Sequence, residues 1–208
     1  HVEGGINKNG SPDSTSATTF SSHAEGSGTL ASGYVSHAEG GNTIAGGNYS
    51  HAEGSRTTAG GNYSHAEGYY TTASGYGSHA EGYNTIASGY GSHAEGYGGK
   101  EGLIASGVGS HAEGFGTIAS GNYSHAEGYL TIAGGYGSHA GGYGLASKLE
   151  NSKVIASGDT SFAHFRVTND LGTIGSYGDY SVIIGGNDHN IGTGSTSSGI
   201  FAGSGNTI

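Results

Sequence analysis

The chain has 208 residues, including 46 glycines, one proline and no cysteine, methionine or tryptophan. Its formal net charge is −10 and its six lysines and arginines form no basic patch, so no nucleic-acid partner is predicted. Without cysteine there is no disulfide or thiolate metal site, and no apolar run approaches membrane-spanning length, so no membrane insertion is predicted. Only 32% of the residues are hydrophobic but 10% are aromatic, which favours a thin, regular β structure over a disordered linker.

Histidines recur every 14 residues from His23 to His93 and again from His111 to His139. Each unit, such as SHAEGYNTIASGYG at 78–91, is two near-copies of Ser/Thr-x-Ala-x-Gly-x-x. This period predicts coils of two five-residue strands with two-residue turns, stacked about 4.8 Å apart. Ser/Thr, Ala and Gly are expected to fill a narrow interior, while the second and fourth positions of each strand face outward. Glycine and asparagine are expected to dominate the turns.

The repeats predict the first domain, a β-roll over residues 1–143 with a polar loop insertion at about 5–20. Residues 144–180 are expected to form a transition with one degenerate coil, in which Phe162 takes the His position and His164 the Glu position.

The C-terminal residues show a different unit. SVIIGGNDHNI (181–191) and SGIFAGSGNTI (198–208) align at an offset of 17. This alignment predicts a second β repeat unit over 181–208. Because both ends of the sequence are repeat fragments, we expect the chain to continue beyond this fragment.

An interior of Ala, Ser and Gly buries too little apolar area to stabilise one chain alone. A column of outward-facing apolar side chains on the second strands offers an association face, and a closed symmetric oligomer would bury it. The column consists of Leu30, Ile44, Ile86, Ile104, Ile118 and Ile132.

The segments SHAEG and TIASG resemble the head repeat of YadA-like trimeric autotransporter adhesins, and the resemblance covers residues 22–143. The family repeat reads Asn-Ser-Val-Ala-Ile-Gly, followed by a second strand that ends in Ala-Ser-Gly. Related His-Ala-Glu-Gly repeats occur in phage tail fibres and other virion proteins. The resemblance implies an all-β fold: a two-strand-per-coil left-handed parallel β-roll (β-solenoid) forming a homotrimer. A second trimeric β-helix or β-prism segment is expected to follow it.

The sequence departs from the family pattern where the family has Val and Ile, because His and Glu stand there. Two arrangements therefore remain open. Either His–Glu networks lie near the trimer axis and link chains, or the isoleucine column faces the axis and the His–Glu face is the outer wall.

The His-x-Glu pattern has a metal-binding interpretation and a structural one. Imidazole and carboxylate on one strand face suit zinc or nickel. However, so many copies exceed what a catalyst needs, and a histidine beside each glutamate relieves repulsion along the carboxylates. We predict a structural His–Glu ladder, with no catalytic residue, no metal and no cofactor. The ladder comprises His23, Glu25, His37, Glu39, His51, Glu53, His65, Glu67, His79, Glu81, His93, Glu95, His111, Glu113, His125 and Glu127.

An aromatic residue follows most His-Ala-Glu-Gly segments. These rings either stack as a corner ladder or form a surface that binds sugars or a receptor. The predicted aromatic ladder comprises Tyr69, Tyr83, Tyr97, Phe115, Tyr129 and Tyr143.

The predicted function is a structural, host- or surface-binding segment of a trimeric phage or virion tail fibre or spike, which is not an enzyme. The alternative is the head of a bacterial trimeric adhesin. In both cases the chain is extracellular, on a virion or a cell surface, and binds a host receptor or glycan. A polysaccharide-degrading tail spike would need paired carboxylates, and the candidates are Asp159, Asp170, Asp179 and Asp188.

Overall fold

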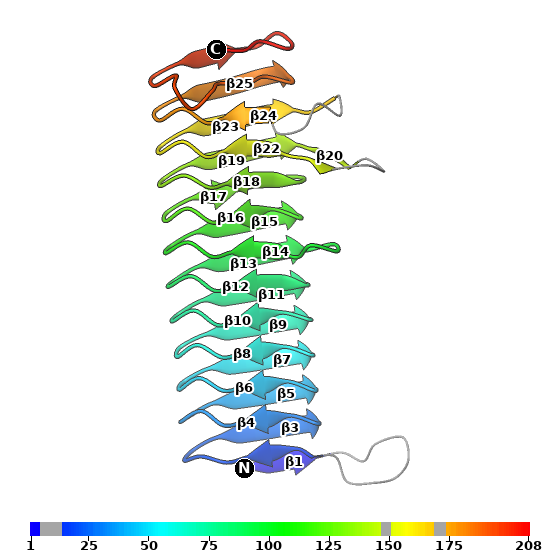
Figure 1. Cartoon of the computed structure of the whole chain (residues 1–208). Helices are drawn as coiled ribbons and strands as arrows, with labels where there is room; N and C mark the ends of the chain where they lie inside the picture. Colours follow the sequence, from blue (N-terminus) through cyan, green and yellow to red (C-terminus); the bar gives the residue numbers. More distant parts are fainter. Residues whose placement is uncertain (5–13, 147–150, 169–173) are drawn as a thin grey trace. The chain divides into compact units, whose positions relative to one another are not determined.

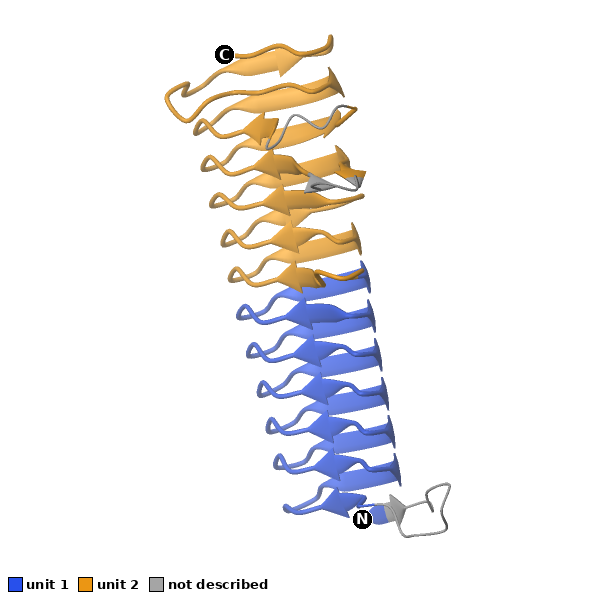
Figure 2. Cartoon of the chain, turned by 45° about the vertical axis from the view of Figure 1, so that its right-hand side comes forward, with its two compact units in different colours: residues 1–97 blue, residues 98–208 orange. Residues whose placement is uncertain are grey.

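The computed structural model describes residues 1–4, 14–146, 151–168 and 174–208. They divide into two compact units, unit 1 (residues 1–97) and unit 2 (residues 98–208), which are coloured separately in Figure 2. The described residues contain no helix long and apolar enough to cross a membrane. Most of the predicted loop insertion falls on residues 5–13, outside the described residues.

Unit 1 is a parallel β-solenoid with two strands per coil (Figure 1). One sheet has the order β1-β3-β5-β7-β9-β11-β13, with the bounds Val2–Gly4, His23–Ser27, His37–Gly41, His51–Ser55, His65–Tyr69, His79–Tyr83 and His93–Tyr97. The other has the order β2-β4-β6-β8-β10-β12, with the bounds Ser16–Ala17, Leu30–Ala31, Ile44–Ala45, Thr58–Ala59, Thr72–Ala73 and Thr85–Ala87. His65 pairs with His79, and Thr72 pairs with Ile86, so the predicted 14-residue coil is confirmed.

Unit 2 repeats this arrangement. One sheet has the order β15-β17-β19-β23-β25-β26, with the bounds His111–Phe115, His125–Ala126, His139–Tyr143, Phe162–Arg166, Val182–Asn187 and Gly199–Phe201. The other has the order β14-β16-β18-β22-β24, with the bounds Leu103–Ala105, Ile118–Ala119, Thr131–Ala133, Val154–Ala156 and Ile174–Ser176. An antiparallel pair, β20 (Leu145–Ala146) and β21 (Asn151–Ser152), leaves the coil between β19 and β22.

Strand register in unit 2 confirms two expectations. Phe162 pairs with His139, and His164 pairs with Gly141, so these residues take the His and Glu positions of the degenerate coil. Val182 pairs with Gly199, which is the predicted offset of 17 residues. A second trimeric segment over 181–208 stays a prediction.

The solenoid interior is a stack of small side chains. Ala66, Ala80 and Thr71 are fully buried, and the corresponding residues of the neighbouring coils are equally inaccessible. The Ser64 hydroxyl donates a hydrogen bond to the Gly61 carbonyl at 2.7 Å, and the same bond recurs at Ser78. The predicted Ser/Thr and Ala interior is confirmed, and the serine closes the corner that leads into each long strand.

Two details of the predicted coil are wrong. The second strand of each coil has only two or three residues, because the chain turns directly after it. After β10, for example, the Ser74 and Gly75 amides both donate to the Ala87 carbonyl of the next coil, and the chain turns at these two residues. Gly82 is exposed rather than interior. Its φ of +101° breaks the side-chain alternation of the strand, and a Cβ there would lie 2.2 Å from the Gly96 carbonyl oxygen.

The turn chemistry also differs from expectation at the Gly-Asn-Tyr corners. Tyr49 and Tyr63 hold φ of +56° and +59°, which side chains seldom adopt. The Asn62 Oδ1 accepts the Asn48 amide at 2.9 Å, and the Tyr63 amide donates to the Asn48 carbonyl at 2.8 Å. These ladder bonds between coils, together with ring stacking, offset the cost of the left-handed conformation.

Candidate functional site

The His–Glu ladder of unit 1 runs along the outer face of the first sheet. In-register pairing places each histidine beside the histidine of the next coil and each glutamate beside the next glutamate, as in β9 and β11. From His23 to His93 the ring centroids are 4.7–4.9 Å apart and the rings are nearly parallel, at 1–6°. The parallel register of the sheet therefore makes a continuous stack of imidazoles.

Several ladder carboxylates lie near two histidines. The Glu67 Oε1 is 3.4 Å from Nε2 of His79, in the following coil. Nearer the N-terminus the contact falls within one strand instead, as between His37 and Glu39 at 3.7 Å. Both side chains of the His79–Glu67 pair are about one-third exposed, at 35% and 32%. The predicted pairing of His with Glu is therefore present, in two alternative forms.

Several imidazole nitrogens in this ladder lack a hydrogen-bond partner. The Nε2 atoms of His23, His37, His51, His65 and His79 are buried and make no hydrogen bond among the described residues. His65, Glu67 and His79 each offer a ligand atom, and the three atoms lie within 4.8 Å of one another. The ladder thus places buried imidazole nitrogens close to carboxylate oxygens.

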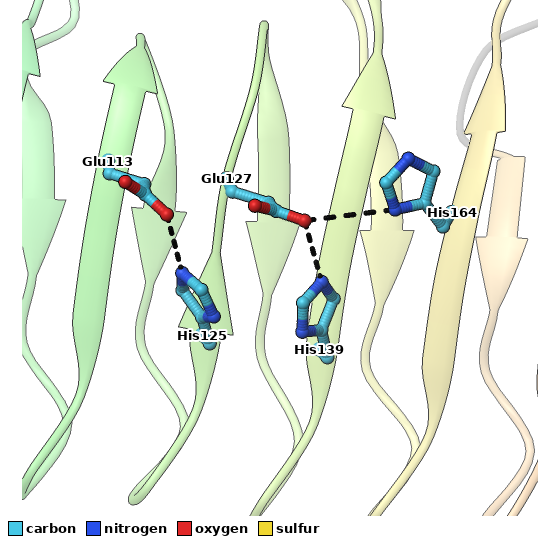
Figure 3. A network of polar contacts seen from close by, with 5 residues as sticks. All are labelled: Glu113, His125, Glu127, His139 and His164. Atoms are coloured by element: carbon cyan, nitrogen blue, oxygen red, sulfur yellow. Dashed lines mark hydrogen bonds and ion pairs between the residues drawn. The ribbon is translucent and has the colours of Figure 1, made fainter.

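Figure 3 shows the corresponding network in unit 2. Glu113 contacts His125 at 3.1 Å, and Glu127 contacts His139 at 3.2 Å. The Glu127 Oε1 also lies 3.8 Å from Nδ1 of His164. Gly141 holds the intervening glutamate position, and a Cβ there would be 2.7 Å from that Nδ1 atom. The glycine therefore gives His164 room to approach Glu127.

Burial changes the proton affinity of His139. Desolvation lowers the pKa of its imidazole, and the charge of a protonated His125 lowers the pKa further. The Glu127 carboxylate acts in the opposite direction. The neutral imidazole is therefore the favoured form at this end of the ladder.

The aromatic ladder stacks at the corner that follows the same sheet. In unit 1, Tyr83 lies 5.5 Å from Tyr69 and 4.6 Å from Tyr97, measured between ring centroids. In unit 2, Tyr129 lies 4.8 Å from Phe115 and 4.7 Å from Tyr143. The unit 1 rings are 39–46% exposed, so they stack on one another and still present a surface.

The chain matches a known protein family along unit 1, where the histidine stack is most regular. Residues 24–50, 52–78, 66–92 and 80–98 match the family described as YadA head domain repeat. These residues are YadA head domain repeats. The YadA head repeats include most of the unit 1 His–Glu ladder and the Tyr69, Tyr83 and Tyr97 rings. No curated protein sequence matches the chain.

The YadA head repeats favour one of the two functions expected from sequence. They suggest the head of a trimeric adhesin, a structural domain that is typically not an enzyme. They give no specific support to a phage tail fibre, so the alternative expectation is favoured over the main one.

A second aromatic column accompanies the YadA head repeats, and the aromatic ladder predicted from the sequence does not include it. Tyr49 and Tyr63 stack at 5.1 Å, and Tyr63 also contacts Tyr76 at 5.2 Å. Tyr49 and Tyr63 lie one position later in the repeat than Tyr76 and Tyr90. The shared corner motifs GNYS and GYGS are the signal that identifies them as members of one column.

The acidic candidates beyond the YadA head repeats bind backbone amides. The Asp159 Oδ1 accepts from the Tyr136 amide at 3.1 Å, and the Asp179 Oδ1 accepts from the Asp159 amide at 2.9 Å. The Asp188 carboxylate accepts from the amide and hydroxyl of Thr168. Asp159 and Asp179 therefore continue the corner role of Asn48 and Asn62, while Asp170 lies outside the described residues.

Unit 2 has one further feature at its N-terminal side. A shallow pocket forms where the 98–102 insertion meets Phe115, Tyr129 and Leu130. Lys153 forms an ion pair with Glu101 at 2.8 Å beside it. This pocket is open and shallow, and it lies beside the aromatic ladder of unit 2.

Proposed function

We propose that this chain is part of the extracellular head of a trimeric adhesin, a structural segment that binds a host or other surface and catalyses no reaction. The observation that carries the proposal is the match of residues 24–50 and 52–98 to YadA head domain repeats. The two-strand coil supports it, because such repeats build a stiff stack that holds binding surfaces away from an anchor. The left-handed β-roll of the family is the expected hand.

The partner within the assembly is two further copies of the chain. The interior of each unit 1 coil buries mainly Ala, Ser and Thr, so this part of a single chain gains little hydrophobic stabilisation. We place the His–Glu face toward the threefold axis, where stacked rings and partly exposed carboxylates present a flat, ordered surface. The isoleucine column would then face outward.

The aromatic ladder is the proposed contact surface for a host receptor or glycan. Tyrosine rings bind sugar faces and protein surfaces while their hydroxyls stay hydrated. Tyr69, Tyr83 and Tyr97 are about two-fifths exposed and lie on consecutive coils. A ladder of this kind offers a repeating site, so weak individual contacts add by multivalency.

The adhesion test uses the 208-residue chain immobilised on beads and presented to host cells and to a glycan array. Wild type is expected to bind, and a triple variant, Y69S/Y83S/Y97S, is expected to lose most binding while its circular dichroism stays unchanged. The matched control replaces Tyr63, Tyr76 and Tyr90 in the other column. Equal binding by the triple variant and wild type would refute the assigned surface, and absence of any binding by wild type would refute the adhesive function.

A further inference from the structure

The His–Glu ladder contains repeated sets of two imidazoles and one carboxylate. We propose that His65, Glu67 and His79, and the equivalent triads of other coils, bind a divalent transition-metal ion such as Zn²⁺ or Co²⁺. Two histidines and one glutamate are a donor set that zinc accepts in proteins, with a further position left for water. This proposal goes beyond the adhesive function and does not depend on it. It departs from the prediction, made from the sequence, that the ladder holds no metal.

The interatomic distances suit this chemistry. Bonds of about 2.0–2.2 Å to nitrogen and oxygen put two ligand atoms of a tetrahedral zinc site about 3.4 Å apart. The Nε2 of His79 and the Oε1 of Glu67 are 3.4 Å apart. The corresponding atoms of His93 and Glu81 are 3.6 Å apart. One imidazole and one carboxylate are therefore already placed as two ligands of a single ion.

The second histidine must rotate to complete the set. Stacked rings point their Nε2 atoms in parallel, and the three donor atoms of a triad lie within 4.8 Å rather than 3.4 Å. The ladder permits such a rotation, because His125 and His139 in unit 2 meet at 72° instead of stacking flat. A turn of one ring about both its Cα–Cβ and Cβ–Cγ bonds would bring its nitrogen toward the shared carboxylate.

The unsatisfied nitrogens give an independent reason to expect a ligand. Buried polar atoms in native proteins nearly always have a hydrogen-bond partner, so orphaned ones call for an explanation. The Nε2 atom of His65 is buried and forms no hydrogen bond among the described residues. The Nε2 atom of His79 forms none either, and its nearest charged neighbour is the Glu67 carboxylate at 3.4 Å. A metal ion would take a lone pair from each imidazole and satisfy both atoms.

Charge along the ladder also favours a cation. Adjacent glutamates such as Glu67 and Glu81 are register partners, and two carboxylates about 5 Å apart repel by roughly 1 kcal/mol even in water. The chain has six Lys and Arg against 16 Asp and Glu, so few positive side chains compensate. Divalent ions bound between coils would neutralise the column and brace neighbouring coils together.

The repeat predicts more than one ion per chain. In unit 1, the triads His23–Glu25–His37 and His65–Glu67–His79 share no residue, so both can be filled at once. In unit 2, His111, Glu113 and His125 form an equivalent triad. Neighbouring triads that share a histidine, such as the one at His37, Glu39 and His51, compete with these.

The test is a titration of the chelator-treated, tag-free chain with Co²⁺ and Zn²⁺, followed by calorimetry and by the visible spectrum of bound cobalt. We expect a stoichiometry above one ion per chain, a cobalt spectrum typical of tetrahedral nitrogen and oxygen ligands, and a higher Tm with Zn²⁺. Mg²⁺ and Ca²⁺ are not expected to compete, because they prefer all-oxygen sites.

The test variant replaces every glutamate of the ladder by glutamine, which removes the carboxylate from each triad and keeps the side-chain size. The replaced residues are Glu25, Glu39, Glu53, Glu67, Glu81, Glu95, Glu113 and Glu127. We expect its affinity to fall by about tenfold or more, since even supporting residues around metal sites contribute 10–100-fold. The control Y69S/Y83S should bind as wild type does. If the glutamine variant binds cobalt as tightly as wild type, the ions sit elsewhere and the proposal is wrong.

A second measurement needs no variant. In ¹⁵N spectra of histidine-labelled wild type, Zn²⁺ should shift the Nε2 resonances of the ladder. A zinc concentration of about 100 μM is far above the dissociation constants of structural zinc sites. Unchanged resonances, or no binding at that concentration, would overturn the proposal. The mass of the chelator-treated chain is measured in parallel, so failure of metal binding and failure of trimer formation are separate outcomes.

Discussion

At the scale of single residues, the glycine that ends each His-Ala-Glu-Gly segment permits the close approach of neighbouring coils. Gly68 has a φ of +108°, and a Cβ there would lie 2.2 Å from the carbonyl oxygen of Gly82. The obstacle is backbone rather than a flexible side chain, so the neighbouring coil cannot give way locally. Gly77 has a φ of +61°, and a Cβ there would meet no other atom within 4 Å.

This contrast predicts the effects of two alanine substitutions. Gly68→Ala should lower the free energy of unfolding by about 3 kcal/mol or more, because it adds a backbone clash to an unfavourable φ. Gly77→Ala should lower it by only about 1 kcal/mol, the cost of left-handed φ alone. Urea unfolding monitored by circular dichroism measures both. Equal losses would show that the clash does not constrain the coil stack.

Two histidines with lowered pKa values, His139 and His189, predict acid sensitivity. Burial lowers the pKa of His139 and of His189, and the Nδ1 of the fully buried His189 accepts the Asn206 amide at 3.2 Å. The charges facing them are His125, Glu127 and His164 around His139, and Asp188 beside His189. The unfolded chain binds more protons than the folded chain near the ordinary histidine pKa of about 6.5. The contribution of these two histidines to the free energy of unfolding is therefore fully present above that pH, and it is lost as the pH drops toward their lowered folded-state pKa values.

Thermal unfolding between about pH 5 and pH 8 checks this expectation above the range in which carboxylates titrate. The Tm should be level above about pH 7 and should decline below about pH 6.5. His189→Asn keeps an acceptor for the Asn206 amide but cannot be protonated, so its decline should be shallower. A level Tm across the whole range for wild type would contradict the assignment.

At the scale of the coil, interior hydroxyls differ in whether they are satisfied. The Thr71 hydroxyl is fully buried and has no hydrogen-bond partner among the described residues, whereas the Ser64 hydroxyl donates to Gly61. Thr71→Val should raise the free energy of unfolding by about 1 kcal/mol, because it removes an unsatisfied polar atom at constant shape. Ser64→Ala should lower it by about 1 kcal/mol. Stability changes of the same sign in the two variants would refute the assignment of the Thr71 hydroxyl as unsatisfied and the Ser64 hydroxyl as satisfied.

The two faces of one coil can be tested against each other. His79 on the His–Glu face and Ile86 on the opposite face are both half-buried and belong to the same repeat. If the His–Glu face meets the threefold axis, His79→Glu should reduce the trimer fraction by about tenfold or more, and Ile86→Glu should leave it unchanged. Sedimentation velocity at matched concentration measures both. The reverse pattern would place the isoleucine column on the axis.

Much of the coil could be predicted from the sequence because its period is regular. Ser78, Ala80 and Thr85 lie inside as expected, since strict alternation fixes which face each side chain takes. Gly82 does not, because its positive φ interrupts the alternation, and nothing in the sequence pattern separates it from Gly89. Whether a histidine contacts the glutamate of its own strand or of the preceding coil depends on side-chain rotamers, which the repeat does not encode.

At the scale of the whole molecule, coils with small interior residues create the need for partner chains. The buried residues of unit 1 are mainly Ala, Ser and Thr, while unit 2 also buries Leu103, Ile183 and Ile191. Larger interior side chains stabilise the C-terminal coils more, because each buries more apolar area. Unit 1, which carries the YadA head repeats, should therefore depend more on trimer formation than unit 2.

The mass of the folded chain in solution tests the central claim, a trimeric adhesin head, most directly. Light scattering coupled to size exclusion, or sedimentation equilibrium, gives this mass in chelator-containing buffer without reference to shape. We predict a mass three times that of one chain, with no folded monomer on dilution. A folded species with the mass of a single chain would contradict a trimeric head.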